Sequence, residues 1–316
     1  MGKASRTKVD VSRREKIAAQ QAAARRGEQR RRILIGSGSI LVVLVIVVVF
    51  VVVKLNSKSG TDTSSNGPTG SALASVVKTV TSVPASTLDA VGAGSGIIST
   101  PESITGTALT ENGKPEMLFL GAEYCPYCAA ERWAMVVALS RFGTFTGLST
   151  VHSAAANGGG EAEPYPNTPT WTFVHATYTS QYLTFTSVET ETNIPDTANK
   201  AYTALQTPTQ AQDALLAKYD VPPLVPAGDQ GAIPFVDFGN KYALGGAGYL
   251  PSTLAGLSWA TVAADLSNPS NTVAKAVDGT ANYITAAICG ITGNTPASVC
   301  NSTIQALETK IASLTG

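Results

Sequence analysis

The longest uninterrupted apolar stretch of the chain covers residues 33–53. Its 21 residues carry no charge and are mostly Val, Ile and Leu. At 1.5 Å per residue, a helix of this length spans about 31 Å, which matches the hydrocarbon core of a bilayer. A cleaved signal peptide is the alternative, but its apolar region is usually shorter and a small-x-small site would follow it. The pattern therefore predicts a single transmembrane helix.

Charge is unevenly distributed, although the whole chain is neutral. Residues 1–32 contain 11 Lys or Arg and 3 Asp or Glu, so the remainder, with 11 and 19, carries a balance of −8. A nucleic-acid-binding tail is one interpretation. The adjoining apolar segment instead favours a topology signal that keeps this end in the cytoplasm, with no nucleic-acid partner. We expect a cell-membrane protein with a basic cytoplasmic tail (1–32), a transmembrane helix (33–53), a flexible linker (54–71) and an extracytoplasmic domain (72–316).

The rest of the chain alternates between helical and strand-like patterns, which is typical of an α/β domain. Two runs rich in Thr, Val and aromatic residues, 171–178 and 182–189, predict an antiparallel strand pair. The pair Gly239-Asn240 predicts the turn of a hairpin that covers 232–244. Further strands are predicted at 105–110, 117–120 and 149–153, and helices at 72–81, 84–91, 129–142, 207–219 and over most of 258–314, with breaks at 268–269 and 290–296.

Two cysteines separated by Pro-Tyr stand where the apolar strand at 117–120 gives way to a predicted helix. Cys125 and Cys128 therefore lie at a helix start, where backbone N–H groups and the helix dipole favour a thiolate. A zinc site would need two more ligands, but Cys289 and Cys300 are not spaced as a second Cys-x-x-Cys pair. A structural disulfide or a metal chaperone would also account for two cysteines at this spacing. The strand–helix context favours thiol–disulfide chemistry that needs no cofactor.

The other cysteines, the histidines and a group of glutamates are interpreted as structural or surface residues rather than as parts of a site. The four cysteines of the chain fit two disulfides in an oxidising compartment. Cys289 and Cys300 are interpreted as a structural disulfide, and a second redox pair that exchanges electrons with the first is the alternative. Two histidines in strand-like runs are interpreted as structural or surface residues: His152 and His175. Four glutamates are interpreted as solvated surface residues rather than as metal ligands: Glu161, Glu163, Glu189 and Glu191.

The octapeptide Gly-Ala-Glu-Tyr-Cys-Pro-Tyr-Cys, residues 121–128, and Ile233-Pro234 ahead of the hairpin resemble the thioredoxin fold. A resemblance to an uncharacterised family of membrane-anchored thioredoxin-like proteins is closer and covers roughly residues 80–305. It implies a central mixed sheet with helices on both faces, enlarged by an inserted β pair and a helical C-terminal region. The segments that carry it are 113–115, 121–133, 138–145 and 234–240, together with Cys289 and Cys300.

The resemblance also implies roles for individual residues. Cys125 would be the nucleophile and Cys128 the resolving thiol. Pro234 would be the cis-proline facing the disulfide, and the backbone of Ile233 would pair with a substrate strand. Glu123 stands where thioredoxins often carry a similar acid.

One position departs from the thioredoxin pattern. Phe119 stands six residues before the first cysteine, where thioredoxins carry a buried acid that helps to move the proton. Glu123, Glu116 or water would have to take this part, and the direction of electron flow stays open. We expect a thiol–disulfide oxidoreductase that acts on exported proteins and is recharged by a membrane redox partner. A redox-inert binding or assembly module with the same fold is the alternative.

Overall fold

The computed structural model describes residues 67–158 and 162–311. The predicted basic tail (1–32) and transmembrane helix (33–53) lie outside this part, as does the linker up to residue 66. Within the described ranges, no helix is long and apolar enough to cross a membrane. Helix α3 (Gly70–Val80) begins two residues before the helix predicted at 72–81, within the last residues of the predicted linker.

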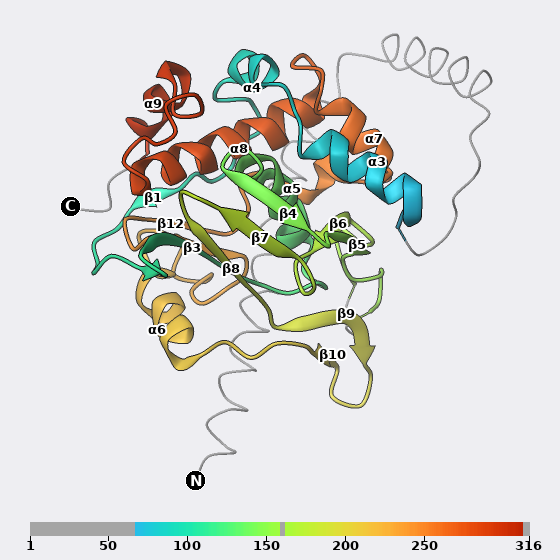
Figure 1. Ribbon diagram of the computed structural model, residues 1–316. Coiled ribbons are helices and arrows are strands. Elements are labelled where there is room, and N and C mark those ends of the chain that lie inside the picture. The colour runs from blue at the N-terminus through green and yellow to red at the C-terminus, as the bar shows by residue number, and fades with distance from the viewer. Residues whose placement is uncertain (1–66, 159–161, 312–316) are drawn as a thin grey trace, which may run out of the picture. The chain divides into compact units, whose positions relative to one another are not determined.

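A mixed sheet forms the centre of the described domain (Figure 1). Its strands run in the order β1-β12-β11-β3-β2, and β8 also pairs with β3. β3 is antiparallel to β11 and parallel to β8, and β11 and β12 form the predicted hairpin. The strands are β1 (Glu102–Ser103), β2 (Thr110–Glu111), β3 (Lys114–Gly121), β8 (Thr184–Glu189), β11 (Phe235–Phe238) and β12 (Tyr242–Gly245).

Helices cover both faces of this sheet because the buried residues of β3 alternate between two cores. Met117 and Phe119 belong to the larger core, together with residues of α5 (Pro126–Leu139) and α8 (Thr272–Ile291). Leu118 and Leu120 belong to a smaller core, which α6 (Gln210–Tyr219) closes. In Figure 1, α8 and α6 accordingly lie on opposite sides of the sheet.

Helix α5 is more deeply buried than its sequence indicates. An apolar stripe through Trp133, Val136 and Val137 predicts one face that packs on a sheet. The structure instead buries every residue from Cys128 to Leu139. The indole N–H of Trp133 donates to the backbone oxygen of Pro169 at 2.8 Å, which places the chain after α5 over its second face. The helix that begins at the cysteine pair is therefore held on all sides.

The segment between α5 and β8 contains a correction to the predicted topology. Residues 171–178 and 182–189 do not pair with each other. Strand β8 is parallel to β3 instead, and the inserted strands form two separate antiparallel pairs, β4–β7 and β5–β6. Strand propensity identifies strands but not their partners, and a parallel partner can be many residues away. The bounds are β4 (Gly143–Thr146), β5 (Ser149–His152), β6 (Pro169–Thr172) and β7 (Thr177–Ser180).

A further pair of strands follows directly on β8. β9 (Glu191–Asp196) and β10 (Ala201–Ala204) form an antiparallel hairpin. Backbone hydrogen bonds from Leu205 to Thr190 and from Gln206 to Glu189 close its base at the end of β8. This hairpin was not predicted from the sequence.

The C-terminal region is helical, with the predicted breaks. α7 (Trp259–Asp265) ends before Asn268-Pro269, and α8 begins after Asn271, whose side chain accepts a hydrogen bond from the Val273 N–H. α9 (Ser302–Glu308) packs against α8, and so does α4 (Ala85–Val91), whose Asp89 accepts hydrogen bonds from the side chain of Asn301. A short 3-10 helix, η1 (Pro251–Leu254), connects the hairpin to this region.

Candidate active site

The cysteine pair lies where β3 ends and α5 begins. Cys125 is the residue that caps α5, and Pro126 occupies the first helical position, where its missing N–H costs nothing. The backbone N–H of Cys128 donates to the sulfur of Cys125 at 3.2 Å. This N–H and the positive end of the helix stabilise negative charge on that sulfur.

Both cysteines are free thiols, and they differ in access to solvent. Cys125 is 5% exposed and Cys128 is fully buried. A reacting partner therefore reaches the sulfur of Cys125 first. This order matches the nucleophile and resolving roles that the resemblance implies, which stay predictions.

The segment before β11 faces the cysteine pair. The Cys125 thiol donates to the backbone oxygen of Ile233 at 3.7 Å. The bond between Ile233 and Pro234 is cis, and the oxygen of Pro234 accepts the N–H of Gly246 at 2.8 Å. Ile233 is 108 residues away from Cys125 in the sequence. The structure thus brings the Ile233–Pro234 segment to the sulfur of Cys125.

Glu123 lies in the loop between β3 and the cysteine pair. Burial raises the pKa of its carboxyl, and the negative charge of Glu189 adds to this, whereas a hydrogen bond with Thr172 and the charge of Arg132 lower it. Its backbone N–H donates to the oxygen of Glu191 at 2.9 Å. Within the described ranges, no hydrogen bond joins the Glu123 side chain to either cysteine.

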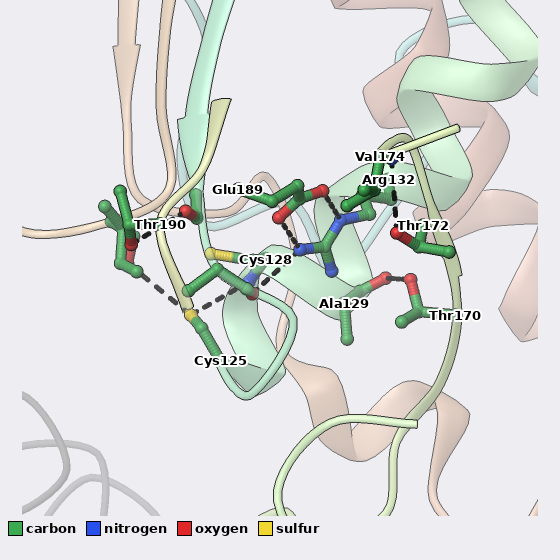
Figure 2. A network of polar contacts seen from close by, with 12 residues as sticks. Cys125, Cys128, Ala129, Arg132, Thr170, Thr172, Val174, Glu189 and Thr190 are labelled. Atoms are coloured by element: carbon green, nitrogen blue, oxygen red, sulfur yellow. Dashed lines mark hydrogen bonds and ion pairs between the residues drawn. The ribbon is translucent and has the colours of Figure 1, made fainter. Parts of the chain in front are cut away.

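A buried ion pair adjoins the cysteines, and sequence reasoning missed it. Arg132 donates from Nε to Glu189 Oε1 at 2.8 Å and from Nη2 to Glu189 Oε2, with both side chains fully buried (Figure 2). Nη2 also donates to the backbone oxygen of Ala122 at 2.7 Å. The interpretation of Glu189 as solvated surface is therefore wrong. A signal was present in the sequence, since Glu131 and Arg132 interrupt an apolar helix and Arg132 follows Cys128 by one turn.

Phe119, six residues before Cys125, lies beside the buried ion pair. Phe119 is fully buried, and its ring lies 5.6 Å from the Arg132 guanidinium carbon. Its ring also packs edge-on against Phe173 at 5.9 Å. The buried side of the site therefore contains an aromatic ring and an arginine–glutamate pair.

The pKa of Cys128 depends on its burial and on the neighbouring Cys125, Arg132 and Ala122. Burial raises it well above its ordinary value, and the hydrogen bond and the charge interaction with Cys125 raise it further. The positive charge of Arg132 and a hydrogen bond with the Ala122 backbone lower it. Arg132 is thus the charged side chain that stabilises a Cys128 thiolate in this otherwise apolar environment.

Aromatic side chains flank the motif on the strands that follow it. Tyr124 stacks on Tyr202 of β10, with ring centres 4.4 Å apart. Tyr127, inside the motif, meets Tyr165 edge-on at 5.9 Å. The β9–β10 hairpin and the loop before β6 therefore each place an aromatic ring against a tyrosine next to the cysteines.

The second cysteine pair forms a disulfide away from this arrangement. Cys289 near the end of α8 and Cys300 before α9 are bonded at an S–S distance of 1.96 Å, and both are buried in the larger core. Its interpretation as a structural bond rather than a redox pair stays a prediction. In the described ranges, no group of three His, Cys, Asp or Glu could hold a metal ion. The ring of His152 packs on Trp259 at 4.5 Å.

Comparison with models of protein families gives one match. Residues 101–290 match the model of the family described as Domain of unknown function (DUF929). The chain belongs to the DUF929 family. The matched region contains the cysteine pair, the Arg132–Glu189 ion pair and the Ile233–Pro234 bond, and it ends before Cys300. Neither the curated proteins nor the solved structures gave a match.

Proposed function

We propose that this DUF929 protein is a thiol–disulfide oxidoreductase with a thioredoxin-like fold. The observation that carries the proposal is the free Cys125–Cys128 pair at the start of α5, with the Cys125 thiol against the oxygen of Ile233. Reactive cysteines lie at helix starts beside polar groups, whereas inert structural cysteines are buried in apolar surroundings.

The connection around the motif supports the thioredoxin-like assignment. The helix that begins at the cysteine pair lies in the connection between two parallel strands, β3 and β8, which also contains β4 to β7. A Cys-x-x-Cys near a β-α-β unit is typical of thioredoxin-like redox proteins. The β11–β12 hairpin lies antiparallel on the other edge of β3, directly after the Ile233–Pro234 bond. The inserted strand pairs and the helices after the hairpin enlarge this unit.

The proposed exchange proceeds through a mixed disulfide. A substrate thiolate attacks the sulfur of Cys125, the Cys125–Cys128 bond breaks, and Cys128 leaves as a thiolate. A second substrate thiolate then attacks the substrate sulfur of the mixed disulfide and releases Cys125 as a thiolate. The substrate loses two electrons and the cysteine pair gains them, while the two thiol protons pass to solvent or to the released thiolates. The reverse sequence reduces a substrate disulfide.

The proposed location follows from the sequence. With residues 33–53 as a single transmembrane helix and the basic tail in the cytoplasm, the domain acts outside the membrane on thiols and disulfides of exported proteins. A membrane redox partner returns the pair to its starting state after each exchange.

A trapping experiment tests the proposal. The Cys128→Ser variant of the full chain lacks the resolving thiol and should accumulate mixed disulfides with exported proteins, which appear as bands that a reductant removes. Cys125→Ser is the matched control and should trap none. No trapped species in cells, together with no exchange on a model dithiol peptide, would refute the proposed function.

One observation favours the alternative of a redox-inert binding module. Both sulfurs are nearly excluded from solvent, with Cys125 only 5% exposed. The inert module predicts that Cys125 stays unmodified by an alkylating reagent in the folded, reduced protein. The redox proposal predicts that Cys125 is alkylated before Cys128, and mass spectrometry of the peptides distinguishes the two.

A further inference from the structure

A fixed positive charge adjoins the cysteine pair. Arg132 follows Cys128 by four residues on α5, so both side chains lie on one face of the helix. Its Nη2 donates at 2.7 Å to the oxygen of Ala122, which also accepts the N–H of Cys125 at 3.3 Å. The guanidinium group is thus bound to the same carbonyl that holds the backbone of Cys125 (Figure 2).

Glu189 keeps this arginine in place. The two side chains form two parallel hydrogen bonds, a geometry that fixes the guanidinium plane. Glu189 is the last residue of β8 and lies opposite Gly121, the last residue of β3, which precedes the cysteine loop. Its position is therefore set by the central sheet rather than by a flexible loop.

The surroundings strengthen the effect of the charge. Arg132 and Glu189 are both fully buried, and the ring of Phe119 covers the guanidinium group. Charge interactions are stronger away from water, because less solvent screens them. Burial lowers the pKa of Arg132, but the charge of Glu189, its hydrogen bonds and the charge interactions with Cys128 and Cys125 together raise it above its ordinary value, so the arginine stays positively charged.

The charge acts on one redox state only. Reduction of the disulfide creates a thiolate, which a nearby cation stabilises, whereas the uncharged disulfide gains nothing from it. A stabilised reduced form gives a disulfide a higher reduction potential and makes it a stronger oxidant. A buried acid alone would have the opposite effect on a thiolate.

We propose that Arg132 and Glu189 are positioning residues that make Cys125–Cys128 an oxidising pair, whose substrates are reduced dithiols of exported polypeptides. This inference rests on the proposed function and adds the direction of electron flow, from the substrate to the cysteine pair. The substrate dithiol is oxidised to a disulfide and the Cys125–Cys128 bond is reduced to one thiol and one thiolate, whose negative charge Arg132 stabilises. Of the two protons that the substrate loses, one passes to the thiol of the pair and the other to solvent. A disulfide-bearing membrane partner then takes the two electrons from the pair.

The test is the equilibrium of the full-length protein with oxidised and reduced glutathione. Arg132→Met removes the cation and should shift the equilibrium constant at least tenfold towards the protein disulfide, which corresponds to about 30 mV. Glu189→Gln removes the anion, keeps the arginine and should shift the constant in the opposite direction. Arg132→Lys keeps the charge and should remain within about threefold of the wild-type constant.

Two further variants separate electrostatics from folding. Asp278→Asn removes a different buried carboxyl, in α8, and should leave the constant unchanged. If Arg132→Met does not fold, the double variant Arg132→Met/Glu189→Met removes both charges without leaving an unpaired one, and the constant should again shift towards the disulfide. A structural role alone would not give opposite shifts for Arg132→Met and Glu189→Gln.

The possible failures are distinguishable. A wild-type chain that forms no Cys125–Cys128 disulfide at any glutathione ratio would overturn the proposed function, and this inference with it. A redox-active chain in which Arg132→Met, or the double variant in its place, leaves the constant within about twofold of wild type would overturn this inference alone. So would equal shifts in one direction for the arginine and the glutamate variants.

Discussion

Asp278 provides a sharp test of the electrostatics of the core. It lies in α8 with no exposed surface, and in the described part of the chain neither of its carboxyl oxygens has a hydrogen-bond partner. Burial raises its pKa from 3.8 to about 8. The carboxyl is therefore protonated in the folded protein at pH 7 and ionised in the unfolded chain.

The sign and size of the effect follow from this difference. A carboxyl whose pKa is raised on folding takes up a proton, so its contribution to stability is complete below about pH 4 and is lost as the pH rises towards 8. Between these limits one such group changes the free energy of unfolding by about 1.4 kcal/mol per pH unit. From pH 5 to pH 7, Asp278 should therefore cost the protein about 2.7 kcal/mol.

The Asp278→Asn variant isolates this contribution, because an amide does not titrate. Urea denaturation of wild type and variant at pH 5, 6 and 7 gives the difference in free energy of unfolding at each pH. Further raised carboxyls, such as Glu131 and Asp237 with pKa values of about 7, cancel in the difference. The variant should gain about 1.4 kcal/mol relative to wild type with each pH unit.

A control and a refuting result complete the design. Asp196 is exposed, and hydrogen bonds with Asn199 lower its pKa, so it is ionised in both states throughout this pH range. Asp196→Asn should therefore show no pH dependence relative to wild type. A difference for Asp278→Asn that stays constant from pH 5 to pH 7 would show that its carboxyl is ionised in the folded protein, which would contradict the reasoning from burial.

Three further variants test local features of the fold. Cys289 and Cys300 are 11 positions apart, and replacing both by Ala should lower the free energy of unfolding, measured by urea denaturation, by about 3 kcal/mol. Exchange on a dithiol peptide should persist in this variant, and its loss would indicate a redox role for the second pair. Gly279→Ala places a Cβ 2.8 Å from the Gly94 Cα and should cost about 1–3 kcal/mol in the same assay; an unchanged midpoint would contradict this contact. Thr209→Ala removes the side chain that caps α6 and should cost about 1 kcal/mol, with Thr209→Ser as the conservative control that retains the cap.

Local sequence patterns predicted much of the element order. The hairpin around Gly239-Asn240 and the helix breaks at 268–269 and 290–296 each depend on a few adjacent residues. The cysteine pair at a strand–helix junction is equally local. The cap at Thr209 shows the limit of such patterns, since α6 begins after it rather than at Pro208.

Long-range partners could not be predicted in this way. Residues 182–189 have the composition of a strand whatever they pair with, and only the packed domain makes β8 the parallel neighbour of β3. Glutamates at 189 and 191 look alike in sequence, yet Glu189 is fully buried on Arg132. Burial depends on which distant segments cover a residue, so a charge run alone does not reveal it.

The sequence by itself therefore determined the cysteine pair and its position at a helix start, because this arrangement depends only on neighbouring residues. The tertiary structure decided what surrounds that pair. It placed Ile233 against the sulfur of Cys125, and it paired Arg132 with Glu189 beside Cys128. These contacts join residues from 57 to 108 positions apart, and no local periodicity encodes them.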